Sequence, residues 1–148
     1  MQLHDAFPAS HASINYPANS KSELIRDLGV RLCRVAGVDP KECVQALLDR
    51  EALGSTGMGD GTAIPHARLA ALREPIGFVV RLRKAIDFEA IDGRPVSLVC
   101  LLLLPAGNAT LASETLAKAS RRFRDPVALK GLQNAVSNAA FHQAFVTR

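Results

Sequence analysis

The residue with the clearest chemical potential is His66, which follows Pro65 in a glycine-rich stretch at residues 54–68. Pro65 has a fixed φ and no amide donor, and it pushes Ile64 into an extended conformation, so the backbone that carries His66 should be stiff. An unperturbed histidine has a pKa of about 6.5, so near neutral pH much of it is uncharged and nucleophilic. His66 is therefore a candidate acceptor of a phosphoryl group.

Groups that bind anions lie close to His66 in the sequence. Arg50 can donate to two oxygens of one phosphate, and the hydroxyls of Ser55 and Thr56 can add hydrogen bonds. The backbone amides of Gly57 and Gly59 can approach an anion closely, because glycine has no side chain. Phosphoryl transfer needs mainly such donors and correct positioning. A purely structural role stays open, because glycine-rich loops often only connect strands.

Other sequence signals for phosphate or metal chemistry are weak. No Gly-Lys-Ser/Thr run forms a Walker A loop, and no Gly-x-Gly-x-x-Gly opens a helix after a strand. His4, His11 and His142 lie near the termini at spacings that make no metal site, and we expect them to be solvated. Asp60 is a conceivable general base but fits a turn better. Arg68 could flank the site, pair with the acidic surface of a carrier, or be a solvated charge.

The composition is that of one domain over residues 1–148. With 48% hydrophobic and 22% charged residues, the chain is neither disordered nor collagen-like. The longest apolar run, residues 98–104, is too short for a membrane span, and the first residues lack a signal peptide, so we expect a cytoplasmic protein with no membrane insertion. Residues 1–12 show no period and should form an irregular lead-in.

The charge and cysteine patterns argue against nucleic acid and against disulfides. The net charge is +4, but aromatic residues are only 5% and form no stacking surface, so a phosphate-bearing or acidic partner fits at least as well as a nucleic acid. Cys33, Cys43 and Cys100 lie among apolar neighbours without a Cys-x-x-Cys motif, so we expect buried free thiols. Basic residues concentrate late in the chain, at Lys118, Arg121, Arg122, Arg124 and Lys130.

Helix and strand signals alternate along the chain. A capping box at residues 20–23 begins a helix that Gly37 ends, and Asp39 with Pro40 begins another that ends near residues 50–53, so Arg50 lies where helix gives way to loop. Strands are predicted at residues 13–16, 76–82, 86–88 and 96–104, and later helices through residues 111–123, 129–136 and 140–145. This order predicts an α/β (α+β) fold in which helices cover both faces of a mixed sheet of about five strands.

Two runs around the candidate site resemble one known family. LLDREALGSTG at residues 47–57, leading into GTAIPHA at 61–67, resembles the fructose/mannitol-type IIA domain of the bacterial sugar phosphotransferase system, and within it the nitrogen-regulatory IIA branch. The resemblance extends through AIDF at 85–88, DGRPV at 92–96 and RDP at 124–126, and covers about residues 13–136. It implies the IIA mannitol/nitrogen-type fold, a mixed sheet between helices.

The resemblance also implies a function. His66 would accept a phosphoryl group on Nε2 from a histidine-phosphocarrier protein, either the general sugar carrier or its nitrogen-branch relative, and Arg50 would lie beside the phosphate. The domain itself would bind no metal or nucleotide. Nitrogen-branch proteins regulate targets such as potassium transport components or sensor kinases according to their phosphorylation state, so regulatory partners of that kind are implied here.

One departure from the family pattern concerns Ala112. Family members usually carry a second active-site histidine at this place, and here Thr110, Ser113 or Thr115 would have to compensate for the missing hydrogen bond. Two alternatives therefore stay open. The chain would be a regulatory binding module that is not phosphorylated, or a sugar-specific IIA component that passes phosphate to a transporter-linked IIB domain.

Overall fold

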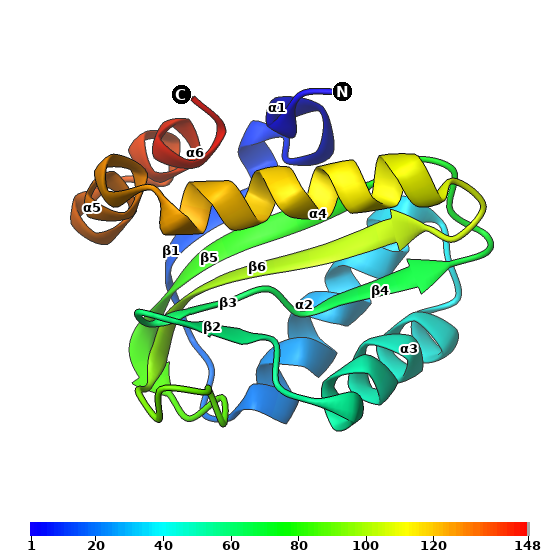
Figure 1. Cartoon of the computed structure of the whole chain (residues 1–148), viewed down its shortest axis with the longest axis horizontal. Coiled ribbons are helices and arrows are strands. Elements are labelled where there is room, and N and C mark those ends of the chain that lie inside the picture. Colours follow the sequence, from blue (N-terminus) through cyan, green and yellow to red (C-terminus); the bar gives the residue numbers. More distant parts are fainter. Residues whose placement is uncertain (148) are drawn as a thin grey trace.

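A mixed sheet of six strands forms the middle of the molecule in the computed structural model, which describes residues 1–147 (Figure 1). The strand order is β1-β5-β6-β3-β2, and β4 also pairs with β6. β5 and β6 are antiparallel, whereas β1 runs parallel to β5, and β3 and β4 run parallel to β6. The strands are β1 (Ala12–Tyr16), β2 (Gly57–Gly59), β3 (Thr62–Ala63), β4 (His66–Leu69), β5 (Ile76–Ile86) and β6 (Val96–Pro105).

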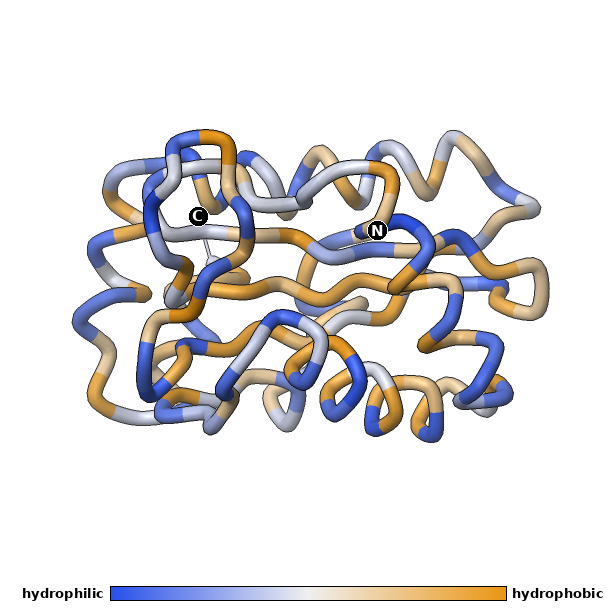
Figure 2. Tube along the Cα trace, turned by 90° about the horizontal axis from the view of Figure 1, so that it is seen from below, coloured by the Kyte–Doolittle hydropathy of each residue, from blue (hydrophilic) through white to orange (hydrophobic). Residues whose placement is uncertain are grey.

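Helices cover both faces of this sheet, as the sequence predicted. One core joins α2 and α3 to the sheet, and a second core joins α1, α4, α5 and α6 to the opposite face. Figure 2 shows apolar residues concentrated in the strands between these layers. The helices are α1 (Leu3–Ala6), η1 (Ala9–His11), α2 (Lys21–Ala36), α3 (Pro40–Leu53), α4 (Ala109–Arg124), α5 (Pro126–Asn134) and α6 (Asn138–Val146).

The strand β6 is apolar on both sides because it lies between the two cores. Successive side chains of a strand point to opposite faces, so Val99 and Leu101 enter the core under α2 and α3, whereas Leu102 and Leu104 enter the core under α4. Every residue of β6 except Ser97 is buried. The strand predicted at residues 96–104 is therefore confirmed, and β3 and β4 both pair with it.

The helix boundaries follow the predicted capping signals. Ser20 accepts a hydrogen bond from the Glu23 amide at 3.2 Å, and Asp39 accepts one from the Lys41 amide at 3.1 Å. Gly37 closes α2 in the left-handed conformation, with φ of 73°. Asp125 both ends α4 and caps α5, since its carboxylate accepts from the Val127 amide at 3.0 Å. These caps place Arg50 in the last turn of α3.

The N-terminal segment differs from the irregular lead-in that the sequence suggested. It contains α1 and η1, and Phe7 between them is fully buried against Phe145, with ring centroids 5.0 Å apart. Gly77 makes this packing possible, since a Cβ atom there would come within 2.3 Å of the Phe7 ring.

The expectation of solvated histidines is wrong for His11 and His142. Both are buried by this segment, and their rings hydrogen-bond the carbonyl oxygens of Gly77 and Phe7 at 3.0 and 2.7 Å.

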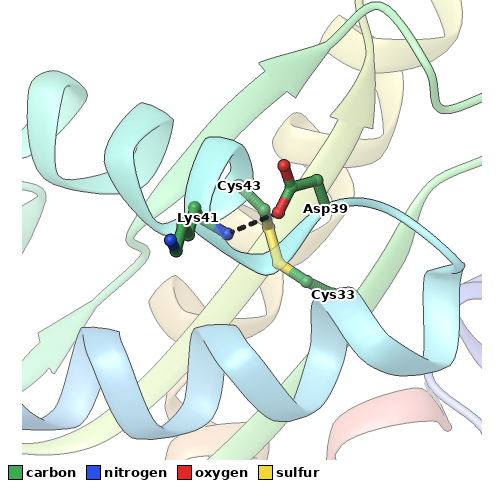
Figure 3. Close-up of a disulfide and its surroundings, with 4 residues drawn as sticks. All are labelled: Cys33, Asp39, Lys41 and Cys43. Atoms are coloured by element: carbon green, nitrogen blue, oxygen red, sulfur yellow. Dashed lines mark hydrogen bonds between the residues drawn. A yellow bond between two sulfur atoms is a disulfide. The ribbon is translucent and has the colours of Figure 1, made fainter.

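The expectation of three free thiols is also wrong, because Cys33 and Cys43 form a disulfide (Figure 3). Cys33 lies near the end of α2 and Cys43 in the first turn of α3, so the tight connection between the helices brings their Cα atoms to 6.3 Å. The two cysteines are ten positions apart in the sequence, and only the helix pairing shows that they meet. Cys100 is free, and its burial raises the pKa of the thiol.

The region after β5 differs from the prediction as well. The strand continues to Ile86 with an irregularity in its pairing to β6 after Arg81, so no separate edge strand forms at residues 86–88. A turn does follow at Asp92 and Gly93, and Gly93 has a φ of 70°.

None of the helices within residues 1–147 is both long and apolar enough to cross a membrane.

Candidate functional site

His66 is positioned by the strand β4, which lies at the edge of the sheet and pairs with β6. β3 and β4 pair one after the other with β6, and Ile64 and Pro65 form the break between them. The Pro65 carbonyl accepts a hydrogen bond from the Leu102 amide at 2.9 Å, which ties this break to the central strand. His66 is consequently the first residue of β4 and not part of a loop. The glycine-rich stretch before it forms the hairpin of β2 and β3.

The His66 ring is oriented by the backbone that precedes it. Its Nδ1 lies 2.8 Å from the Ile64 carbonyl oxygen. Because a carbonyl oxygen can only accept, Nδ1 carries the proton and Nε2 has the free lone pair. The ring is half-buried, so Nε2 is the nitrogen that is open to a reaction partner.

The surroundings of His66 favour its neutral form. Its pKa is lowered from the ordinary 6.5, chiefly because burial disfavours the charged ring, with smaller contributions from the charges of Arg50 and Arg68. The hydrogen bond to Ile64 and the charge of Glu51 act in the opposite direction without cancelling the effect. The ring is thus an uncharged nucleophile across the neutral pH range.

Arg50 and His66 line one shallow pocket of about 460 Å³ beside β4. Arg50 comes from the last turn of α3, which packs against β4, and its Nη1 donates to the Gly54 carbonyl oxygen at 2.8 Å. Arg68, also on β4, lines the same pocket, as does Leu53 at the end of α3. The structure thereby brings together the two residues predicted to act on a phosphoryl group and adds a second guanidinium to them.

The other predicted phosphate ligands do not line this pocket. Ser55 donates to the Phe88 carbonyl oxygen at 2.6 Å and accepts from the Gly57 amide at 3.0 Å. The Thr56 hydroxyl donates to the carboxylate of Glu51, whose other oxygen accepts from the Thr56 amide at 3.0 Å. These hydrogen bonds hold the chain between α3 and β2. A Cβ atom on Gly57 would come within 2.8 Å of Ala90, so this glycine is required for close packing.

Glu51 is the structural residue of the site that the sequence did not single out. It is only 8% exposed and follows Arg50 directly. Besides Thr56, its carboxylate contacts Lys21 of α2, whose Nζ lies 3.2 Å from Glu51 and 3.2 Å from Glu89. The ion pair links the start of α2 to the end of α3 and so fixes the turn from which Arg50 extends. No residue type or spacing reveals this role, because it depends on how the two helices pack.

Asp60 belongs to the turn between β2 and β3. It has a positive φ of 55°, its amide donates to Asp92 at 3.1 Å, and its carboxylate lies 3.3 Å from the Arg94 guanidinium. The Arg94 and Asp60 amides lower the pKa of Asp92 by donating to its carboxylate. The turn-forming interpretation of Asp60 is confirmed, and Asp60 does not line the pocket of His66.

Ala112 lies in the first turn of α4 and is fully buried. Thr115 is buried too, and its hydroxyl donates to the Leu111 carbonyl oxygen at 2.8 Å. Ser113 is exposed and accepts a hydrogen bond from Nη2 of Arg68 at 3.3 Å.

Within the part of the chain that the structure describes, no three His, Cys, Asp or Glu side chains are grouped so that they could hold a metal ion.

Comparison with known proteins gives the family. The model of the family described as "Phosphoenolpyruvate-dependent sugar phosphotransferase system, EIIA 2" matches residues 6–147. A nitrogen regulatory protein of Bradyrhizobium diazoefficiens is 39% identical over 115 residues, which make up 78% of this chain and 75% of that protein.

Solved structures agree with this match. The crystal structure of nitrogen regulatory protein IIA-Ntr from Neisseria meningitidis is 33% identical and superposes with a TM-score of 0.89 over 97% of this chain and 98% of that one. Enzyme IIA for mannitol from Escherichia coli, solved in complex with phosphorylated enzyme IIB, is 21% identical and covers 94% of this chain and 96% of that one, with a TM-score of 0.77. That last likeness shows the fold alone. The chain belongs to the EIIA type 2 family of the phosphotransferase system and is similar to its nitrogen regulatory members.

Proposed function

We propose that His66 accepts a phosphoryl group on Nε2 from the phosphohistidine of a histidine-phosphocarrier protein. The observation that carries the proposal is the hydrogen bond between Nδ1 and the Ile64 carbonyl oxygen, which leaves the Nε2 lone pair free on a ring that lines the same pocket as Arg50. The lone pair attacks phosphorus while the donor's P–N bond breaks and its electron pair returns to the donor nitrogen. The Nδ1 proton stays on His66, so no separate base is required.

Arg50 is the phosphate-binding partner in this proposal. One of its five N–H donors is used on Gly54, and the others are free to meet phosphate oxygens. Direct contacts from Ser55, Thr56, Gly57 or Gly59 to the phosphate stay a prediction. The hydrogen bonds and close packing of this segment support a positioning role for it, since it fixes the end of α3.

The test is phosphorylation with the upstream carrier enzymes and phosphoenolpyruvate. We expect one phosphate per chain, in an adduct that is labile in acid and stable in base, and its loss in His66→Ala. Mass spectrometry locates the phosphate, and phosphorus NMR distinguishes Nε2 from Nδ1. An adduct that persists in His66→Ala, or an unlabelled wild type, contradicts the proposal.

The regulatory role follows from the charge that the phosphate adds. A phosphoryl group brings about −1.5 to −2 charges to a pocket that now presents two guanidinium groups and the carboxylate of Asp49. A partner that contacts this surface would therefore distinguish the two forms. The resemblance to the nitrogen-regulatory branch implies targets such as potassium transport components or sensor kinases, and a pull-down with phosphorylated and unphosphorylated protein tests which form each target binds.

A binding module that is never phosphorylated is the second candidate, because Ala112 stands where relatives usually carry a histidine. It predicts partner binding that His66→Ala leaves unchanged and no adduct under conditions that label a relative with both histidines. A sugar-specific role, in which phosphate passes on to a IIB domain, predicts transfer from phosphorylated His66 to such a domain.

A further inference from the structure

We infer that Arg68, positioned by Ser113, is a second phosphate ligand of this site and takes the place of the histidine that Ala112 lacks. The inference rests on the proposed phosphorylation of His66. It assigns to one exposed arginine a role in the transfer step and to one serine a positioning role.

Strand geometry places Arg68 beside His66. The two residues are separated by one position on β4, so their side chains point to the same side, whereas Ala67 and Leu69 between and after them enter the core under α2 and α3. Residues paired across a ladder share a face, and the partners of His66 and Arg68 on β6 are Leu102 and Leu104. Those two leucines belong to the core under α4. His66 and Arg68 are therefore on the side of the sheet where α4 begins.

The first turn of α4 supplies the group that orients Arg68. Of the three hydroxyls near Ala112, Thr115 is committed to its own helix, while Ser113 accepts from Arg68 Nη2 at 3.3 Å. This contact crosses from the edge strand to the helix on which relatives usually carry the second histidine. It uses one donor of the guanidinium and leaves four N–H groups for an anion.

The charge of Arg68 already acts on the reacting ring. It is one of the charges that lower the pKa of His66, so its positive field reaches the imidazole. A field that disfavours a proton on the ring favours the negative phosphoryl group there. Arg50 and Arg68 come from different elements and line the same pocket, so together they can donate to different oxygens of one phosphate.

The experiment compares Arg68→Gln with Arg124→Gln and wild type. Arg124 is an exposed arginine eleven residues along α4 from Ser113, about 16 Å at the helical rise, and its substitution makes the same change of charge away from the pocket. We expect transfer from the phosphorylated carrier to fall about 10- to 100-fold in Arg68→Gln. The His66 pKa, measured by NMR without any phosphate, should rise in Arg68→Gln and stay unchanged in Arg124→Gln.

Two further variants test the assignment itself. Ser113→Ala should slow transfer several-fold in the wild-type background and have no further effect in Arg68→Gln, because it acts only through the guanidinium. Ala112→His should leave the wild-type rate nearly unchanged but restore part of the rate lost in Arg68→Gln. Thermal unfolding of each variant checks that the fold is intact.

The outcomes separate this inference from the function on which it rests. Wild-type transfer rates in Arg68→Gln, with wild type labelled on His66, overturn the inference alone. A wild type that is not labelled at all overturns both. Slow transfer in Arg68→Gln with an unchanged His66 pKa and no rescue by Ala112→His also overturns it, because the arginine would then act only on carrier docking.

Discussion

The ring Nδ1 of His66 lies 2.8 Å from the carbonyl oxygen of Ile64, two residues earlier in the chain. The orientation of the reacting ring is therefore set by its own backbone and not by a carboxylate from another element. Pro65 stiffens this short path, and its carbonyl is bound to the Leu102 amide of the central strand. The backbone that orients the ring is thereby tied to β6.

The lowered pKa of His66 predicts how the site responds to pH. A histidine with a pKa below 6.5 stays neutral to lower pH than an ordinary one, so the nucleophile should persist in mildly acidic buffer. An NMR titration of the unphosphorylated protein should show a His66 midpoint below 6.5. In Arg50→Gln the midpoint should rise, because the positive charge of Arg50 is one of the causes that lower the pKa of His66. A wild-type midpoint above 6.5 contradicts the prediction.

Replacement of Glu51 should cost stability because its side chain is only 5% exposed and its carboxylate accepts three hydrogen bonds, one from Lys21 and two from Thr56. Glu51→Ala removes the acceptor of the Thr56 amide and hydroxyl and leaves Lys21 paired only with Glu89 and the Phe88 carbonyl, and we expect a loss of about 2–3 kcal/mol in the free energy of unfolding. Urea denaturation measures it. Asp49→Ala is the matched control, since this exposed carboxylate on the same helix contacts only Gln45 and should cost less than about 0.5 kcal/mol. Equal losses in the two variants would contradict a buried network.

The docking of the N-terminal segment can be tested at a single glycine. In Gly77→Ala the new methyl group would meet the Phe7 ring at 2.3 Å and the Leu101 carbonyl oxygen at 3.1 Å, so Phe7 must move. We expect a loss of about 1–3 kcal/mol, together with faster proteolysis of residues 1–11. Gly107→Ala is the control, because nothing lies within 4 Å of its Cβ position, and it should be nearly neutral. Resistance of the Gly77→Ala segment to protease would argue against the packing.

The sequence was sufficient for elements whose signals are local. The caps at Ser20 and Asp39 and the apolar run of β6 act through neighbours in the chain, and all were predicted. The disulfide and the buried histidines were not predicted, because they depend on contacts between distant segments. His142, for example, bonds the carbonyl of Phe7 across 135 positions.

In the candidate site, too, the sequence predicted what residue type and motif determine and missed what depends on contacts between distant segments. His66 and Arg50 could be proposed from residue type and motif, and the pocket contains both. The hydrogen-bond partners of the Ser55 and Thr56 hydroxyls could not be predicted from the sequence. A hydroxyl near an anion site can donate to the Phe88 carbonyl or to the Glu51 carboxylate as well as to a phosphate. Which acceptor it finds is decided by the packing of α3 against the chain after β5.

The disulfide predicts a stability that depends on redox conditions. The disulfide closes a loop between Cys33 and Cys43, which are ten positions apart, and should stabilise the oxidised protein by about 3 kcal/mol through the lost entropy of the unfolded chain. Guanidinium denaturation with and without reductant measures this difference. The double variant Cys33→Ala/Cys43→Ala should be less stable and insensitive to reductant. A wild type whose midpoint does not change with reductant shows that the thiols are not bonded.

The surface around His66 predicts which substitutions weaken recognition of the carrier without touching the chemistry. Leu53 is 86% exposed at the end of α3 and lines the pocket with Arg50 and His66, so a docked carrier would cover it. Loss of that apolar contact in Leu53→Ser should raise the KM for the phosphorylated carrier about 5- to 10-fold, with little change in kcat or in the lifetime of the phosphohistidine.

Val127 provides the control for this surface. It is 82% exposed on α5, which lies away from α3 in Figure 1, and Val127→Ser removes a similar apolar side chain from solvent-facing surface. Its KM should equal that of wild type. Because the Leu53 side chain has no polar atom and carries no charge, a fall in kcat for Leu53→Ser would mean that the end of α3 had moved. The rise in KM would then report the position of Arg50 and not the docking of a partner.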